Sequence, residues 1–406
     1  MVALGVATAS LPWATGMNGF LLITLTTLCM LLLLKGSDLK DRDGRILVML
    51  SAFYFLLHVI SLLYTENMKE GIFHLDKKWS FALVPFSVWL VCMRFPEARK
   101  KVFMSFCASL FGATVVCLGI AVKNNLAENH HFNYPVFFFN KWFYSYKLLS
   151  FNIGIHPSYL SCYLGVVIIF LIWESFRQEK TNRLYIFLII YFVTFMTMLA
   201  ARTVLFSTLG ACFLIAVYGI IRFRKYNYVW AIAAAFILIG VVLFLNDISR
   251  QRMTAIFQSV HASDGQWGTF GVRLLEWKAT FAVIAQHPWI GVAPGDFMDT
   301  LVAEYTRNGW LEPAGQRYNS HNQFLQSFGS FGITGFLCIA AIFLLSFRRA
   351  IVNRDVVYFF MLGIFFIFSL TESTLEVQKG IVFFNLMNSV LFFSEKTLNS
   401  QKNLYD

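Results

Sequence analysis

Charged residues are scarce in this chain. They make up 14% of its 406 residues, whereas 58% are hydrophobic and 17% are aromatic. In soluble globular domains the charged share is about 25%. A chain with so little polar surface cannot cover a water-soluble core of this size. The composition therefore excludes a soluble globular protein and indicates an integral membrane protein.

The sequence also lacks the signals of several chemistries. It has no HExxH zinc motif, no Walker or dinucleotide-binding motif and no serine-hydrolase motif, which argues against nucleotide-driven work. The pair His130-His131 is not joined by a carboxylate cluster, so we expect no metal and no cofactor. The seven cysteines fall within apolar segments and indicate neither a disulfide framework nor a zinc site; they are Cys29, Cys92, Cys107, Cys117, Cys162, Cys212 and Cys338.

Long apolar runs, by contrast, are abundant. Their lengths predict an all-α, polytopic membrane protein with about twelve transmembrane helices, or about eleven if one of the short terminal runs does not cross. The first run lacks the basic residues of a signal peptide, so we interpret it as a span. The runs cover residues 2–15, 18–34, 46–64, 79–93, 102–122, 158–174, 184–200, 203–221, 229–245, 331–347, 356–370 and 381–394.

Lysine and arginine collect in alternate short loops, which predicts that those loops and both termini are cytoplasmic. The net charge of +11 reflects this bias, and no nucleic-acid-binding signature accompanies it. We divide the chain into nine N-terminal helices (1–245), a large, partly helical outer loop (246–330), and three C-terminal helices with a cytoplasmic tail (331–406). The basic loops hold Lys35, Lys40, Arg42 and Arg45; Arg94, Arg99, Lys100 and Lys101; Arg177, Lys180 and Arg183; Arg222, Arg224 and Lys225; Arg348, Arg349 and Arg354.

The outer loop ends in a run that places a histidine at the start of the next apolar helix. Ser320 followed three residues later by Gln323 is a capping box, which predicts that a helix begins at His321. A helix N-terminus favours a neutral imidazole and attracts phosphate. His321 is therefore a candidate base, and the alternative is a polar residue at a membrane interface.

Two arginines are candidates for binding an anion. Arg202 lies at a very short predicted turn between two apolar runs; arginines at membrane depth usually mark a pathway or a ligand site, although Arg202 could also anchor the chain at the headgroups. The outer loop predicts an amphipathic helix at 272–285 and a second helix near 297–308. Arg273, at the start of the first, either pairs with Glu276 or binds a phosphate.

The order of these features resembles the O-antigen ligase and polymerase superfamily, in a variant found in Bacteroidetes-type bacteria. One departure is Ala293-Pro294, where the family more often has Gly-x-Gly. Gly332 and Gly335, three residues apart, serve either close approach of two helices or ordinary packing. The resemblance covers most of the chain and rests on Arg202; on Arg273 with Trp277; on His287, Pro288, Gly291, Gly295 and Phe297; on His321, Asn322, Leu325, Gly332 and Gly335; and on the segments 62–80 and 156–160.

The resemblance implies a GT-C-like membrane glycosyltransferase of lipopolysaccharide biosynthesis in the bacterial inner membrane. Its partners would be a glycan on undecaprenyl diphosphate as the donor, a lipid A–core hydroxyl as the acceptor, and membrane lipids. At the periplasmic face His321 would deprotonate the acceptor, and Arg202 and Arg273 would bind the donor diphosphate. Direct displacement without a metal would invert the anomeric configuration.

Two alternatives to this O-antigen ligase stay open. A polymerase would use the same donor with a lipid-linked repeat as the acceptor; the single long loop that carries His321 favours the ligase. A transporter or flippase of lipid-linked sugars should show internal repeats or charges near mid-membrane, and the sequence shows neither. Four further residues on the same predicted side are possible members of the site: Lys141, Lys147, His156 and Arg317.

Overall fold

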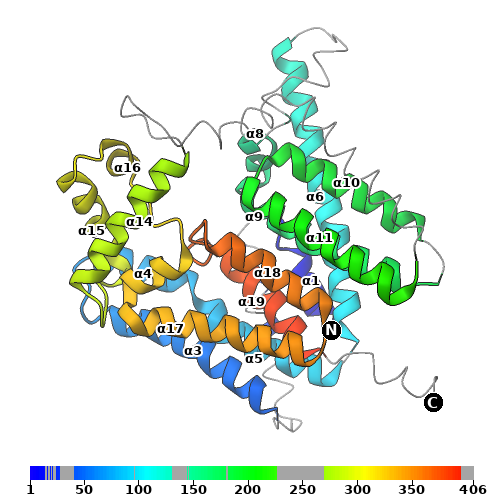
Figure 1. Ribbon diagram of the computed structural model, residues 1–406, viewed down its shortest axis with the longest axis horizontal. Helices are drawn as coiled ribbons and strands as arrows, with labels where there is room; N and C mark the ends of the chain where they lie inside the picture. Colours follow the sequence, from blue (N-terminus) through cyan, green and yellow to red (C-terminus); the bar gives the residue numbers. More distant parts are fainter. Residues whose placement is uncertain are drawn as a thin grey trace.

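The computed structural model describes residues 1–13, scattered positions from 16 to 27, and then 41–95, 97–129, 144, 146–179, 182–225 and 269–394. Within these ranges every regular element is a helix (Figure 1). Along the chain they are α1 (Val2–Ala9), α3 (Arg42–Ser61), α4 (Met68–Lys77), α5 (Trp79–Arg94), α6 (Ala98–Asn129), α8 (Tyr146–Ser150), the 3-10 helix η1 (Phe151–Ile153), α9 (Pro157–Arg177), α10 (Arg183–Leu199), α11 (Arg202–Phe223), α14 (Thr269–Gln286), α15 (Pro294–Arg307), α16 (Leu311–Gln316), α17 (Gln323–Val352), α18 (Val356–Ser369) and α19 (Gln378–Phe393).

Five of the described helices are long and apolar enough to cross a membrane: α3, α6, α9, α11 and α17. The helices α10 and α18 are apolar but shorter. The predicted all-α membrane fold is therefore confirmed. The span predicted at 229–245, and most of the one at 18–34, lie outside the described residues, so the total of about twelve spans remains a prediction from the apolar runs.

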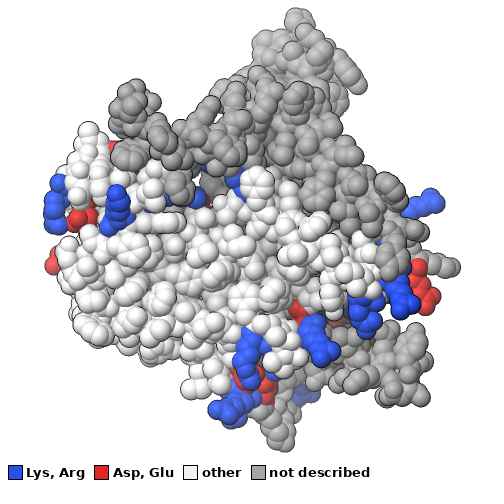
Figure 2. Space-filling view, viewed as in Figure 1, with Lys and Arg blue, Asp and Glu red and all other residues white. Residues whose placement is uncertain are grey.

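The centre of the bundle is built around α9. In the most apolar 18-residue stretch of α9, 89% is buried, compared with 33% in that of α3. The helix packs against α10, α11 and α18. A helix that is apolar on all sides belongs inside a bundle, whereas one with an exposed apolar face in such a protein meets lipid. Figure 2 shows a broad uncharged surface between charged residues at the left and at the lower right, as a membrane-facing belt requires.

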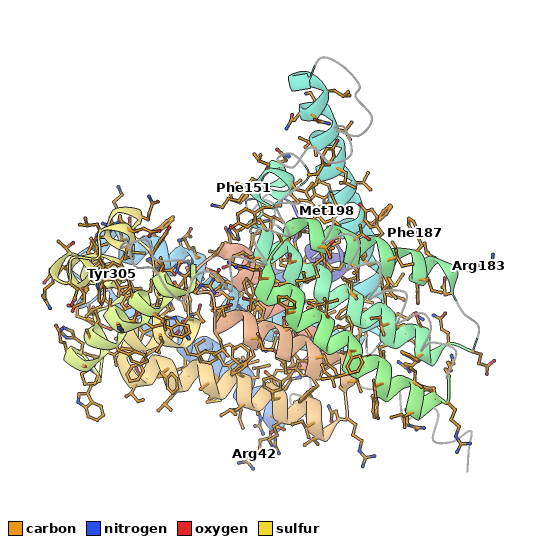
Figure 3. All side chains as sticks on the ribbon, turned by 45° about the horizontal axis from the view of Figure 1, so that its top comes forward. Arg42, Phe151, Arg183, Phe187, Met198 and Tyr305 are labelled. Atoms are coloured by element: carbon orange, nitrogen blue, oxygen red, sulfur yellow. The ribbon has the colours of Figure 1, made fainter. Side chains whose placement is uncertain are left out.

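Three of the basic loops lie together at one end of the bundle. Arg348 and Arg349 on α17 pair with Asp43 and Asp41 beside α3, at 2.6 and 2.9 Å. In the same region Arg99 donates to Asp355. Figure 3 shows Arg42, in this group, at the bottom of the view and Tyr305 at the left. These three of the five basic loops are thus on one side of the fold.

The opposite end carries a small helical unit made of α4, α14, α15 and α16. The predicted helices at 272–285 and near 297–308 are confirmed as α14 and α15, while α4 forms between the predicted spans at 46–64 and 79–93. The unit has an apolar core of its own, formed by Ala279, Val283, Phe297, Leu301 and Tyr305.

A tight turn over residues 287–293 attaches this unit to α17. The N–H groups of Val292 and Ala293 donate to carbonyls within α17 at 3.0 Å each, where Gly332 interrupts the helix with φ 64° and ψ −157°. A Cβ atom on Gly332 would lie 2.2 Å from the backbone of Trp289. Gly332 therefore permits close approach of a turn, which is a different role from the helix–helix packing that its spacing suggested. The boundary that we set at residue 330 falls beside this kink.

Candidate active site

The helix after the outer loop begins later than predicted. α17 starts at Gln323, and its N-cap is Asn322, whose Oδ1 accepts hydrogen bonds from the N–H groups of Phe324 and Leu325 at 3.0 and 3.1 Å. Asparagine caps helices as well as serine does. The predicted capping box is therefore wrong, and His321 lies just before the helix with a left-handed φ of 39°.

Ser320 has another role, because it is fully buried. Its Oγ donates to Gln326 Oε1 at 2.9 Å and lies 3.3 Å from the Oγ of Ser373. Ser373 belongs to residues 371–377, the connection between α18 and α19 that we call the 371–377 loop. The backbone N–H of His321 donates to Asn319 Oδ1 at 2.9 Å. These bonds hold the histidine between α17 and the 371–377 loop.

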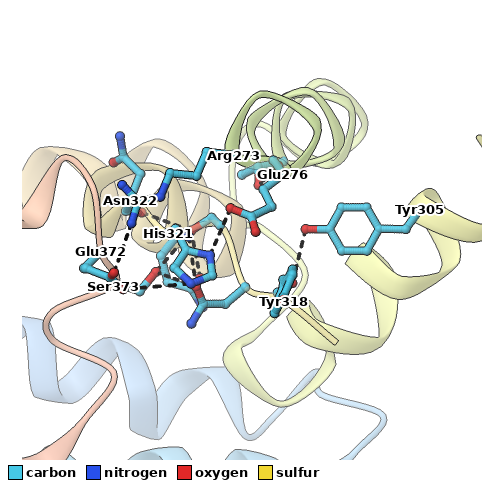
Figure 4. A network of polar contacts seen from close by, with 12 residues as sticks. Arg273, Glu276, Tyr305, Tyr318, His321, Asn322, Glu372 and Ser373 are labelled. Carbon is cyan, nitrogen blue, oxygen red and sulfur yellow. Dashed lines mark hydrogen bonds and ion pairs between the residues drawn. The ribbon is translucent and has the colours of Figure 1, made fainter. Parts of the chain in front are cut away.

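The imidazole of His321 contacts a buried carboxylate. Its Nδ1 lies 2.9 Å from Oε2 of Glu276 on α14 (Figure 4). The Glu276 side chain is 1% exposed and that of His321 is 25% exposed. A buried carboxylate needs a hydrogen-bond donor to offset its lost hydration, so the contact ties α14 to the start of α17.

A second carboxylate joins His321 to Arg273. Glu372, from the 371–377 loop, accepts a hydrogen bond from Arg273 Nη2 at 3.1 Å, and its other oxygen lies 3.9 Å from His321 Nε2. The sequence left open a pairing of Arg273 with Glu276, but the ion pair of Arg273 is with Glu372 (Figure 4). Two of the three predicted site residues, Arg273 and His321, thus lie in one cluster.

The charges around His321 decide its protonation. Burial alone would lower its pKa, but the hydrogen bond to Glu276 and the charge of Glu372 outweigh burial, so the pKa of His321 is raised above its ordinary value. Burial raises the pKa of Glu276, and His321 opposes that effect. The expectation that a helix terminus favours the neutral ring is wrong, because His321 lies outside the helix and between two carboxylates.

Comparison with known proteins supports the family suggested by the motifs. Residues 187–340 match the family model described as O-Antigen ligase. The match supports a relationship to the O-antigen ligase superfamily over this segment. The search of curated proteins gave no match. The matched segment contains Arg202, Arg273 and His321, and the match supports glycan transfer of the ligase or polymerase type in general.

Arg202 occupies the tight turn that the sequence predicts. α10 ends at Leu199, Ala200 adopts a left-handed φ of 49°, and α11 begins at Arg202, which is half-buried. α11 packs against α9 and α18, and α18 leads into the 371–377 loop. The structure therefore places Arg202 on a helix that packs against α18, the helix that precedes the 371–377 loop.

A second ionic cluster anchors the 371–377 loop. Glu376 lies 3.0 Å from the Nζ of Lys78 and 3.3 Å from Nδ1 of His74. The N–H of Leu375 donates to Gln323 Oε1 at 2.6 Å. Burial would raise the pKa of Glu376, but Lys78 and His74 hold it well below its usual range. The loop is thus fixed from α17 and from the α4–α5 junction.

Sequence reasoning missed Glu372, Glu376 and Lys78, and it did not pair Glu276 with His321. The available signal was the presence of two carboxylates in a short outer loop of a chain with only 22 acidic residues. Among the described residues, no group of three His, Cys, Asp or Glu is arranged to hold a metal ion.

Of the four further candidates, the structure describes Lys147, His156 and Arg317, and each has contacts of its own. Arg317 pairs with Asp299 at 2.5 Å, and Lys147 lies near the rings of Tyr146 and Phe151. His156 is the N-cap residue of α9. Lys141 and the pair His130-His131 lie outside the described residues.

Proposed function

We propose that this protein transfers a glycan from undecaprenyl diphosphate to a hydroxyl of lipid A–core at the periplasmic face of the bacterial inner membrane, with both termini in the cytoplasm. The observation that carries the proposal is the cluster in which Glu372 links Arg273 to His321. A fixed cation beside a candidate base is what cleavage of a glycosyl–diphosphate bond requires. The cluster lies at the end of the fold opposite the paired basic loops, which favours the periplasmic side.

In the proposed reaction, the acceptor oxygen attacks the anomeric carbon as its proton passes to His321. The bond from that carbon to the diphosphate oxygen breaks, and the electron pair leaves with the diphosphate. Arg273 and Arg202 bind the developing negative charge, for which the guanidinium fork is suited. A single displacement of this kind inverts the anomeric configuration.

The polymerase is the second candidate, because the family match covers both reactions. A polymerase would transfer the growing glycan to another lipid-linked repeat by the same chemistry. The ligase is preferred since one long outer segment carries both Arg273 and His321. A transporter or flippase has less support, because the clusters around Glu372 and Glu376 both lie on the 371–377 loop, whereas a transporter should carry charges near the middle of the membrane.

The decisive experiment is a transfer assay with purified full-length protein and undecaprenyl-diphosphate glycan. Separate reactions receive lipid A–core or a second portion of donor, and the products are separated by mass on a gel. Glycan on lipid A–core supports the ligase, whereas a ladder of longer lipid-linked chains supports the polymerase. If neither forms while the protein moves the lipid-linked donor across vesicles, the enzyme proposal fails.

The metal-independent mechanism has its own test. Activity that persists in a chelator supports it. Loss of activity that a divalent cation restores would overturn it.

A further inference from the structure

We propose that Glu276 is a positioning residue for the catalytic base: its carboxylate holds His321 with the proton on Nδ1, which leaves the lone pair of Nε2 to accept the proton of the acceptor hydroxyl. The inference rests on the proposed function, since it assigns to His321 the role of base. It concerns a residue for which the sequence suggested only a pairing with Arg273.

The first argument is the hydrogen-bonding capacity of the two groups. An ionised carboxylate accepts hydrogen bonds only, and a neutral imidazole has one N–H donor and one acceptor nitrogen. Because Glu276 Oε2 lies 2.9 Å from Nδ1, the proton of the neutral ring belongs on Nδ1. The ring nitrogen that can act as a base is then Nε2.

The second argument is burial. Glu276 is 1% exposed, so water cannot replace His321 as its partner. The histidine itself is fixed on the backbone side by Asn319, and the ring of Tyr318 lies edge-on to it at 5.8 Å. A carboxylate held in this way orients an imidazole, as second partners do for catalytic and metal-bound histidines in general.

The third argument is the placement of the other charged groups. Arg273 and Glu276 are three residues apart on α14, so both lie on the helix face that meets His321. Glu276 contacts Nδ1, whereas Glu372, the ion-pair partner of Arg273, lies 3.9 Å from Nε2. One helix therefore supplies a cation for the leaving diphosphate and a carboxylate that aims the base toward it.

The proton can be followed through the step. The O–H bond of the acceptor breaks as its oxygen bonds to the anomeric carbon, and the proton moves to Nε2. The resulting imidazolium keeps its Nδ1–H bond to Glu276, which stays ionised and stabilises the positive charge. Product release then returns the proton to solvent.

The kinetic test compares Glu276→Gln and Glu276→Asp with the control Glu312→Gln, which removes an exposed carboxylate from α16. An amide can turn its NH₂ toward Nδ1 and favour the wrong tautomer. We expect Glu276→Gln to lower kcat by about 10²-fold, a typical contribution of acid–base catalysis, with KM for undecaprenyl-diphosphate glycan almost unchanged. Glu276→Asp keeps the charge and should retain more activity, and the control should match the wild type.

The pH profile separates this role from a purely structural one. His321 must be deprotonated to act as a base, so the rate rises with pH through its pKa. Glu276→Gln removes a negative charge that raises this pKa, and the acid limb should move to lower pH. A folded Glu276→Gln protein with the wild-type profile and kcat would overturn the proposal.

A measurement without substrate keeps the inference separate from the proposed function. Protein labelled with ¹⁵N-histidine in lipid nanodiscs, compared with His321→Ala, identifies the resonances of His321. We expect the Nδ1–H tautomer in the wild type and a loss of that preference in Glu276→Gln. An Nε2–H tautomer in the wild type would overturn the inference. If His321→Ala retained transfer activity, the assignment of the base would fail whatever the tautomer.

Discussion

Lys78 places its Nζ 3.0 Å from Oε2 of Glu376 although the lysine side chain is fully buried. The pair joins the α4–α5 junction to the 371–377 loop, and the same loop carries Glu372 to Arg273. The Lys78–Glu376 pair therefore helps to hold the carboxylate of Glu372 near His321, although Lys78 is remote from His321 in the sequence.

Removing one partner of this pair should destabilise the protein strongly. Lys78→Met leaves Glu376 buried beside an apolar side chain, and breaking a buried ion pair costs about 3–5 kcal/mol. We expect a lower thermal midpoint and weaker transfer activity. The double variant Lys78→Met with Glu376→Leu should recover much of the stability, because both charges are gone; a double variant no more stable than Lys78→Met would contradict this account.

Gly332→Ala should disrupt the attachment of the outer helices to α17. The residue has φ 64°, and a Cβ would lie 2.2 Å from the Trp289 backbone, so strain and a clash add together. The measurement is the thermal midpoint and protease resistance of the purified protein. Gly363→Ala is the matched control, since nothing lies within 4 Å of its Cβ position in α18 and alanine favours a helix by about 1 kcal/mol.

Ala293→Gly should stabilise the protein. Ala293 has φ 68° and ψ 149°, a conformation that is essentially reserved for glycine and costs about 1–3 kcal/mol for other residues. This is the position at which the sequence departs from the family pattern. We expect a higher thermal midpoint, because the relief of backbone strain outweighs the loss of packing by the buried methyl group. A lower midpoint would show that the packing of this methyl group outweighs the strain.

Arg202→Lys and Arg273→Lys should each reduce transfer sharply. Lysine keeps the charge but loses the planar fork that binds a diphosphate at two points. Arg317→Lys, at the exposed pair with Asp299, serves as the control. Rates of transfer to lipid A–core at the wild-type level in Arg202→Lys would mean that Arg202 only anchors α11 at the membrane surface.

The rate of transfer should depend on pH in a defined direction. The pKa of His321 is raised by Glu276 and Glu372, and a base must be deprotonated, so the acid limb of the kcat profile should lie above the ordinary histidine pKa of about 6.5. Glu372→Gln removes one of these charges and should shift the limb to lower pH. A limb that stays in place would show that another group controls the rate.

Much of the fold was predictable because membrane helices must satisfy their own backbone groups. The apolar runs at 158–174, 184–200 and 203–221 correspond to α9, α10 and α11, and the amphipathic pattern at 272–285 corresponds to α14. Helix ends were less predictable. Ser320 and Asn322 both suit an N-cap, and burial of Ser320 against Ser373 decided in favour of Asn322.

The sequence by itself determined that this is a helical membrane protein, and its motifs resemble those of the O-antigen ligase superfamily, with Arg202, Arg273 and His321 as candidate site residues. Composition and local periodicity carry the information on the helical membrane fold, because the hydrophobic effect and backbone hydrogen bonding act on short segments. The family and the candidate site residues rest on the resemblance of the motifs. Only the tertiary structure decided which charges meet. Glu276, His321 and Glu372 come from three separate segments, and charges that are distant in the chain interact only after packing brings them within a few ångströms and removes the intervening water.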